Sequence, residues 1–211
     1  MPEPVIIEHS IQPVTDHRRL RLTVILGSNR PERICPAVAD WFLGQARRHP
    51  EITVDLDVCD LAVLALPPDL SGGDDTETFT ERIDDADAVV IITPEYNHGY
   101  PGVLKIAIDT VWQEWRAKPV GFVCYGGVSG GLRAVEQLRG VFGELHAVTL
   151  RDTVSMPNAE DTLDQCGQLH PPQRANSAAD MLLRSLRWWA RATQEALRRE
   201  PYPTGPASGT P

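Results

Sequence analysis

An apolar, β-branched run at residues 22–26 passes directly into Gly27-Ser28-Asn29-Arg30 and then, beyond Arg33, into a helical pattern that begins near Pro36. A buried strand, a polar turn and a helix in this order are the start of a βα unit and favour a parallel sheet. The turn offers an anion several main-chain N–H groups and the positive end of a helix dipole. Arg30 and Arg33 add forked donors that match phosphate oxygens. The junction is therefore typical of a phosphate site; the alternative is a polar turn with solvated arginines.

Two further junctions have the same design. Residues 87–92 are typical of a buried strand and lead into residues 93–102, which are rich in proline, glycine and hydrogen-bonding side chains. Residues 120–125 form another apolar run and lead into residues 126–131, four of which are glycine. Ligands of open α/β sheets bind outside the carboxyl ends of the strands, where the strand order reverses. The unusual residues of all three loops thus lie where a ligand is expected.

Strand and helix patterns alternate along the rest of the chain. We expect strands at 20–26, 52–58, 87–92, 120–125 and 146–150, and helices at 36–49, 79–84, 103–109, 132–141 and 178–199. The alternation in the second strand predicts an edge strand with one polar face, whereas the polar residues 161–176 have no assigned role. We predict one α/β domain over residues 19–199, a flexible arm at 1–18 and a disordered tail at 200–211.

Composition argues against several functional classes. The chain of 211 residues has a formal net charge of −9, which argues against nucleic-acid binding. An arginine series within residues 184–199 is interpreted as a solvated helix face. No apolar run approaches the roughly 20 residues that a membrane span requires, and the residues after Met1 lack the features of a signal peptide. We therefore expect a cytoplasmic protein.

The four cysteines, at positions 35, 59, 124 and 166, are dispersed and form no C-x-x-C motif. Reduced thiols fit this pattern better than a disulfide or a metal site. Cys35 precedes a helix, where a thiol pKa can be lowered, but a small packing residue is the favoured interpretation. His98, in the second loop, is left open between a solvated position and contact with substrate.

Three stretches give the chain a specific resemblance: L-G-S-N-R-P-E-R, T-P-E-Y-N-H-G-Y-P-G-V-L-K and Y-G-G-V-S-G-G-L-R-A-V-E-Q-L-R, in this order between about residues 21 and 158. Together they resemble the NADPH-dependent FMN reductase family. The resemblance implies a flavodoxin-like α/β fold, a doubly wound five-stranded parallel sheet of order 2-1-3-4-5 with helices on both faces. It also implies FMN and NADPH, or NADH, as cofactors.

The same resemblance assigns the expected cofactor-binding residues. Ser28, Arg30 and Arg33, with Cys35 beside them, match the loop that holds the FMN phosphate. The matching residues along the isoalloxazine are Pro94, Glu95, Tyr96 and Asn97, with Tyr125, Gly126 and Gly127 at its other edge. The residue types suit these roles, because glycine allows close backbone approach and Tyr96 offers a large face.

Hydride transfer through a flavin requires no acid–base triad from the protein, so we expect no catalytic side chain and no metal. The predicted activity is an FMN-dependent NAD(P)H oxidoreductase that passes electrons to free flavin, a quinone, or an azo or nitro compound. The alternatives are a flavodoxin-type electron carrier, against which Arg30 and Arg33 argue, and a flavin-binding redox-sensing module. The acceptor and the choice between NADPH and NADH stay open.

A homodimer, or possibly a tetramer, is the expected assembly. Trp112 and Trp115 are three positions apart and are predicted to share one helical surface, while Leu104, Ile108 and Val111 face the sheet. Aromatic side chains are enriched at interfaces, although both tryptophans can instead pack under the chain's own loops. The resemblance favours a dimer that is formed through this helix.

Overall fold

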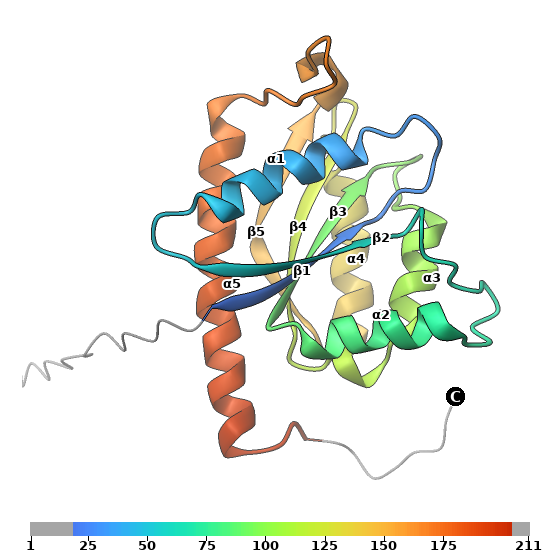
Figure 1. Ribbon diagram of the computed structural model, residues 1–211, viewed down its shortest axis with the longest axis vertical. Coiled ribbons are helices and arrows are strands. Elements are labelled where there is room, and N and C mark those ends of the chain that lie inside the picture. The colour runs from blue at the N-terminus through green and yellow to red at the C-terminus, as the bar shows by residue number, and fades with distance from the viewer. Residues whose placement is uncertain (1–18, 204–211) are drawn as a thin grey trace, which may run out of the picture.

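The computed structural model describes residues 19–203, which form a parallel sheet between two layers of helices (Figure 1). The strands are β1 (Leu20–Leu26), β2 (Val54–Asp60), β3 (Ala88–Pro94), β4 (Pro119–Gly126) and β5 (Val148–Pro157). Their order is β2-β1-β3-β4-β5, and every neighbouring pair is parallel. The predicted fold class and strand order are confirmed. The predicted arm at 1–18 and the tail from 204 onward lie outside the described residues.

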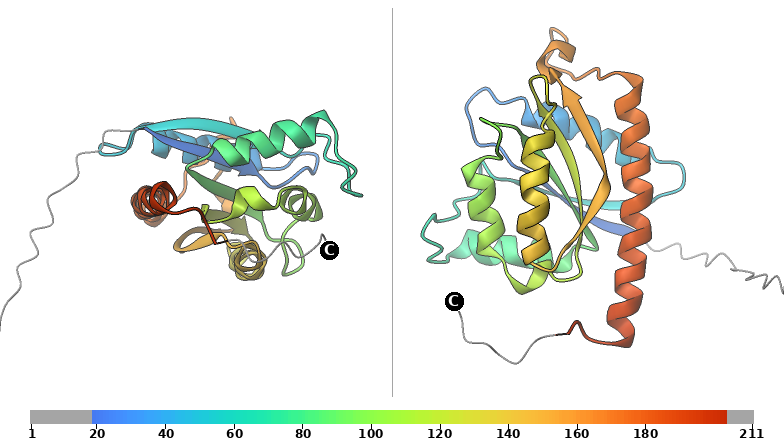
Figure 2. Two further views of the ribbon diagram at one scale, coloured as in Figure 1. Left: turned by 90° about the horizontal axis from the view of Figure 1, so that it is seen from below. Right: turned by 180° about the vertical axis from the view of Figure 1, so that it is seen from behind.

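The helices cover both faces of the sheet. The core on one face is formed with α1 (Cys35–Arg47) and α5 (Gln173–Arg199), and the core on the other with α2 (Asp74–Asp85), α3 (Gly102–Thr110) and α4 (Leu132–Glu144). Accordingly, α1 lies in front of the sheet in Figure 1, whereas α3 and α4 lie in front in the right panel of Figure 2. The chain winds from β1 to β2 in one direction and then crosses to β3. Because such crossovers are right-handed, this reversal of direction places α1 on one face of the sheet and α2, α3 and α4 on the other.

Burial follows the position of each strand in the sheet. All seven residues of β3, from Ala88 to Pro94, are buried, as expected of a central strand with helices on both faces. Strand β2 lies at the edge of the sheet, next to β1, and the side chains of its Asp55 and Asp57 are partly exposed. The prediction that this strand is an edge strand with a polar face is therefore confirmed.

Two helices are longer than the sequence pattern predicts. Helix α2 spans 12 residues because Asp74, Asp75 and Glu77 occupy its first turn, where negative charge interacts favourably with the helix dipole. Helix α5 begins directly after Pro172, five residues earlier than expected, and buries Ala175 on the way to the predicted segment. Both extensions contain few large apolar residues, so the 3.6-residue period marks them weakly.

Strand β5 runs to Pro157 instead of ending near residue 150. The polar residues Arg151, Asp152 and Thr153 interrupt its apolar pattern, and here the register between β4 and β5 shifts. A shift of this kind is a bulge, which edge strands accommodate readily. As a consequence, the chain leaves the sheet at Asn158, at the same edge as the three loops singled out from the sequence.

The two tryptophans do not share a helical surface, so that part of the interface prediction is wrong. Helix α3 ends at Thr110, and the extended conformation of Val111 separates it from a short 3₁₀ helix, Gln113–Trp115. Trp115 is fully buried, and its Nε1 donates to the Ile108 carbonyl at 3.1 Å. Trp112 is 52% exposed. The predicted burial of Leu104, Ile108 and Val111 is confirmed.

None of the helices within residues 19–203 is long and apolar enough to cross a membrane.

Candidate functional site

The loops that follow β1, β3 and β4 are joined by main-chain hydrogen bonds. The Gly27 N–H donates to the Ile92 carbonyl at 2.8 Å, and the Glu95 N–H donates to the Tyr125 carbonyl at 3.0 Å. A side chain at Gly27 would approach the Ile92 oxygen to 3.0 Å, so the first loop lies tightly against β3. The structure therefore brings the three predicted loops together at the carboxyl edge of the sheet.

In the first loop, the predicted polar residues contact the second loop. The buried Ser28 hydroxyl is hydrogen-bonded to the Tyr96 hydroxyl at 2.8 Å. The Arg30 guanidinium is exposed and lies 3.4 Å from the centroid of the Tyr96 ring, in cation–π geometry. Arg30 is thus accessible from solvent, whereas Ser28 lies buried beneath it, and both contact the same tyrosine.

Arg33 holds the first loop in shape. Its Nη1 donates to the Ser28 carbonyl and its Nη2 to the Asp60 carboxylate, both at 2.6 Å. The two charged side chains are 14% and 25% exposed. Asp60 is the last residue of β2, so this ion pair ties the first loop to the end of the edge strand.

Cys35 is a packing residue beneath the loop. The side chain is fully buried, and burial raises the pKa of its thiol to about 11, in spite of the helix that begins there. A thiol with this pKa stays protonated at neutral pH, which confirms the favoured interpretation over a reactive thiolate.

The second loop is a tight hairpin turn. Tyr96 and Gly99 exchange two main-chain hydrogen bonds, and the two residues between them have positive φ, 50° for Asn97 and 68° for His98. Positive φ at both central positions is the pattern of a type I′ turn, which asparagine tolerates well. Asn97 and His98 are thus exposed at the tip of the turn.

Glu95 connects the second loop to α4. Its carboxylate accepts hydrogen bonds from the main-chain N–H and the guanidinium of Arg133, each at 3.1 Å. Burial alone would raise the pKa of Glu95, but hydrogen bonds from Ser129 and Arg133 outweigh burial and hold this pKa below its ordinary value. Glu95 is therefore a negatively charged support of the site.

The third loop depends on glycine at two kinds of position. Gly131 has a φ of 89°, and a Cβ there would lie 2.7 Å from the main-chain nitrogen of Tyr125. A Cβ on Gly127, by contrast, would meet no atom within 4 Å. Gly131 is thus required by the turn itself, whereas Gly127 presents open backbone that a ligand can approach.

Tyr125 contributes a buried hydroxyl. The residue is 6% exposed, and its Oη interacts with the buried Cys35 thiol but makes no hydrogen bond to an oxygen or nitrogen of the described residues. Burial raises the pKa of this phenol well above its ordinary value, so the hydroxyl is protonated at neutral pH. A thiol is a weak hydrogen-bond partner, so the Tyr125 hydroxyl retains donor capacity for a bound molecule.

A pocket of about 250 Å³ lies between these loops. Its lining comes from four segments: Ile34 from the first loop; Pro94, Glu95 and Tyr96 from the second; Tyr125, Gly126 and Gly127 from the third; and Asn158, Ala159, Glu160 and Asp161 after β5. The sequence reasoning missed the fourth segment, because it ended the last strand near residue 150. The alternation of polar and apolar residues at 153–156, after the polar interruption, was the available signal for a longer edge strand.

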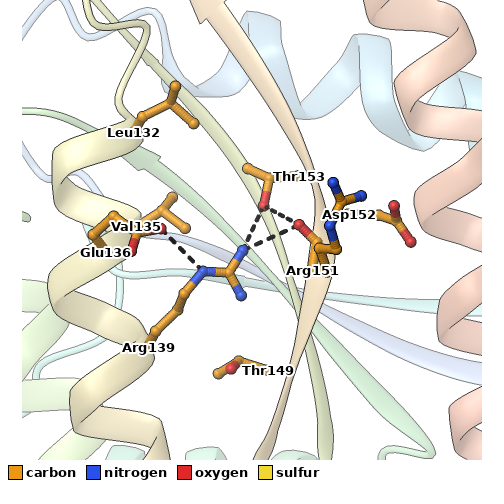
Figure 3. A pocket seen from close by; sticks show the side chains of 8 residues that line it. All are labelled: Leu132, Val135, Glu136, Arg139, Thr149, Arg151, Asp152 and Thr153. Carbon is orange, nitrogen blue, oxygen red and sulfur yellow. Dashed lines mark hydrogen bonds and ion pairs between the residues drawn. The ribbon is translucent and has the colours of Figure 1, made fainter.

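A larger pocket, of about 620 Å³, lies away from the loops, between α4 and β5 (Figure 3). Arg139 reaches across it and donates to the carbonyls of Leu150 and Arg151 and to the Thr153 hydroxyl. This guanidinium is therefore occupied with the irregular part of the edge strand. The larger pocket contains none of the predicted site residues, and we take the smaller one as the functional site.

Chemically, the smaller pocket offers a flat slot, because Tyr96 and the open backbone of Gly127 border a space that suits a planar ring. Ser28 and Arg30 do not line this pocket themselves but contact Tyr96, which does. Within residues 19–203, no three His, Cys, Asp or Glu side chains gather in a way that would hold a metal ion.

Comparisons with known proteins agree with this geometry. The family described as NADPH-dependent FMN reductase matches residues 20–161. A fission yeast (Schizosaccharomyces pombe) NAD(P)H-dependent FMN reductase is 36% identical over 134 residues, which are 59% of this chain and 66% of that protein. A 2-hydroxy-1,4-benzoquinone reductase from a Burkholderia species is 31% identical over 114 residues, 54% of this chain and 58% of that protein. The chain thus spans less than two thirds of each relative's length.

Among solved structures, the flavoenzyme NAD(P)H:(acceptor) oxidoreductase from Paracoccus denitrificans superimposes with a TM-score of 0.62. The superposition covers 82% of this chain and 98% of the Paracoccus protein, at 23% sequence identity. At that identity the likeness concerns the fold.

Proposed function

Because the chain belongs to the NADPH-dependent FMN reductase family, we propose that it oxidises NADPH or NADH through bound FMN and passes the electrons to a quinone or a related small acceptor. The family match confirms the predicted class, an oxidoreductase that uses FMN and NAD(P)H. The quinone is proposed as the acceptor because one similar protein is a benzoquinone reductase. Azo compounds, nitro compounds and free flavin are further acceptors of the same two-electron chemistry.

The observation that carries this proposal is the fit between the pocket and FMN. Tyr125 borders the pocket and has a buried hydroxyl whose neighbour is only the weakly hydrogen-bonding Cys35 thiol, and Gly127 leaves its backbone open to a close approach. An exposed guanidinium, Arg30, lies next to the same pocket wall through its contact with Tyr96. A phosphate, a ribityl chain and a planar ring require this combination of donors and open backbone.

The four residues that the sequence predicts at the phosphate end each have a proposed role. Ser28 and Arg30 would hold the phosphate, exchanging their present contacts with Tyr96 for the ligand's oxygens. Arg33 would act through its charge and by fixing the Ser28 carbonyl, since both of its terminal nitrogens are already bonded. Cys35 would close the floor below the loop as a neutral, buried side chain.

At the ring end, the residues would position FMN and exclude water. Pro94, Tyr96 and Asn97 would border the isoalloxazine from the second loop, and Glu95 would hold that loop against α4 through Arg133. Tyr125 would donate its hydroxyl to the ligand, while Gly126 and Gly127 would allow the ring to lie against the backbone. Bound FMN supplies the two-electron chemistry.

The net reaction is NAD(P)H + H⁺ + quinone → NAD(P)⁺ + hydroquinone. The nicotinamide loses a hydride, which carries two electrons and one proton, and the second proton comes from solvent. The chain's own residues have to align donor and acceptor in turn on one open face of the pocket, and position is the main contribution of a protein to flavin chemistry.

We also propose that two copies associate through the surface around Trp112. Its side chain is 52% exposed directly after α3, and large aromatic side chains are enriched at interfaces. A cytoplasmic location is proposed as well, since all four cysteines are free thiols, the state that reducing compartments maintain.

The proposed activity is tested by steady-state oxidation of NADPH and of NADH by the FMN-loaded protein, with and without 1,4-naphthoquinone. Quinone-dependent turnover is expected with at least one nucleotide. No turnover with NADPH and none with NADH would favour an electron carrier instead. Binding of FMN and of riboflavin then tests the phosphate end. Arg30→Ala should weaken FMN binding by tenfold or more, because a charge-assisted hydrogen bond contributes roughly 1.5–3 kcal/mol, and leave riboflavin unaffected. The exposed Arg47 provides a matched control as Arg47→Ala.

A further inference from the structure

The segment after β5 brings two carboxylates to the pocket. Asn158 leaves the strand, and a 3₁₀ helix, Ala159–Thr162, follows directly. Glu160 and Asp161, in the middle of this helix, line the same pocket as Tyr96, Tyr125 and Gly127. Both carboxylate side chains are exposed. Asp161 is the first residue of the stretch, 161–176, whose role the sequence left unassigned.

The segment is held firmly against the third loop. The Asn158 N–H donates to the Gly126 carbonyl at 2.7 Å, and the Asp161 N–H donates to the Asn158 carbonyl at 3.0 Å. Ala159 is 2% exposed and packs in the core, and the Thr162 hydroxyl donates to its carbonyl at 2.8 Å. The main chain that carries the two carboxylates is therefore fixed beside the pocket.

Unlike the other carboxylates at the site, Glu160 and Asp161 form no ion pair with any residue that the structure describes. The Glu95 carboxylate is paired with Arg133, and Arg33 is paired with Asp60. The remaining cation, Arg30, is assigned to the FMN phosphate. Among residues 19–203, no ion pair involves Glu160 or Asp161. The pocket mouth thus carries two uncompensated negative charges.

We propose that Glu160 and Asp161 select the electron acceptor by charge, so that neutral and cationic quinones are preferred and anionic ones are disfavoured. This inference rests on the proposed function and names the substrate class at that site. An acceptor must approach the pocket through its mouth, and like charges repel each other over a distance set by the ionic strength. Two exposed carboxylates are expected to lower the association of a singly charged anion roughly fivefold at low salt.

The experiment compares wild type with Glu160→Gln/Asp161→Asn, which keeps the side-chain shapes and removes both charges. The acceptors are 1,4-naphthoquinone, its 2-sulfonate, and a naphthoquinone that carries a trimethylammonium group. We expect the ratio of kcat/KM for the sulfonate to kcat/KM for the neutral quinone to rise roughly fivefold in the double variant, and the corresponding cationic ratio to fall. Both changes should shrink in 0.5 M NaCl, where the Debye length is only about 4 Å.

A second readout requires no turnover. Oxidised acceptors are titrated into the oxidised, FMN-loaded protein, and dissociation constants follow from the change in the flavin spectrum. The sulfonate should bind the double variant roughly fivefold more tightly than wild type. Glu144→Gln, an exposed carboxylate at the far end of α4, should change neither measurement.

The outcomes separate the two proposals. Equal sulfonate-to-neutral ratios in wild type and the double variant, or a salt dependence that the substitutions leave unchanged, would overturn the charge selection while the reductase activity stands. If wild type oxidises neither NADPH nor NADH with any of the acceptors, the proposed function and this inference are overturned together.

Discussion

The Glu95 carboxylate accepts two hydrogen bonds from Arg133, one from its main-chain N–H and one from its guanidinium, each 3.1 Å long. Glu95 follows β3, whereas Arg133 is the second residue of α4. The pair therefore joins the second loop to a helix whose residue lies 38 positions further along the chain. The main-chain bond also caps the N-terminus of α4, where a negative charge interacts favourably with the helix dipole.

Glu95→Gln is expected to lower the free energy of unfolding by about 1 kcal/mol, because Arg133 is half exposed and solvent screens part of the charge. FMN affinity should fall as well, since the contact between the second loop and α4 loses its charge. Urea unfolding and FMN titration measure the two effects. Glu136→Gln, on the same helix and 75% exposed, is the matched control.

The same pair predicts a pH dependence. The pKa of Glu95 lies below its ordinary value of 4.5, so the folded state favours the ionised carboxylate. The stabilisation is therefore fully present above pH 4.5 and is lost as the pH falls through the lowered pKa. The difference in unfolding free energy between wild type and Glu95→Gln should accordingly shrink in acid.

The two tryptophans should respond to substitution in opposite ways. Trp115→Ala is expected to cost about 3–5 kcal/mol of stability, because the ring is fully buried and packs edge-on against Phe142, with 5.1 Å between the ring centroids. Trp112→Ala should cost little stability and should weaken dimer formation. Urea unfolding and light scattering at micromolar protein provide the measurements. A Trp112→Ala protein with unchanged mass would contradict the proposed interface.

Gly131, directly before α4, and Gly140, within α4, should respond to substitution by alanine in opposite ways. Gly131→Ala should destabilise the protein by more than about 1–2 kcal/mol, since its φ of 89° and contacts of 2.7 Å leave no room for a Cβ. Gly140→Ala should stabilise it by roughly 0.5–1 kcal/mol, because this helical position is open. Thermal unfolding of both variants checks the prediction, which fails if the two shifts have the same sign.

Lys118 predicts a stability change in base. Its Nζ donates to the carbonyls of Asp84 and Ala86 at 3.0 and 2.7 Å, and burial lowers its pKa from 10.5 to about 8. Between these values the unfolded chain binds more protons than the folded one, so stability rises with pH. Between pH 8 and pH 10.5, the free energy of unfolding of wild type should rise by on the order of 1 kcal/mol relative to that of Lys118→Met.

Lys105, the chain's other lysine, is exposed and serves as the control. The substitution Lys105→Met should leave the pH profile of stability unchanged. Unfolding in urea at pH 8, 9 and 10.5 gives the comparison, and parallel profiles for wild type and Lys118→Met would refute the lowered pKa.

The sheet and the three loops were accessible from the sequence because local patterns determine them. A fully buried strand such as β3 is a continuous apolar run, and glycines such as Gly131 mark the turns that follow the strands. The strand order came from the resemblance, because the pattern of a parallel strand does not identify its neighbours.

What the sequence did not show depends on contacts between distant segments. The polar residues 151–153 hid the continuation of β5, and with it the arrival of Asn158 at the pocket. The helical spacing of Trp112 and Trp115 was misleading because the helix ends before both. Ion pairs such as that of Arg33 with Asp60 require the folded arrangement of two strands.

Strand β1 starts at Leu20 and α5 ends at Arg199, both at the edge of the sheet opposite to the loops (Figure 1). Leu20 and Arg199 therefore offer attachment points for a tether on the side of the domain away from the pocket. The protein should be well suited to oriented immobilisation, for example on an electrode or a carrier bead, with its redox site facing the solution.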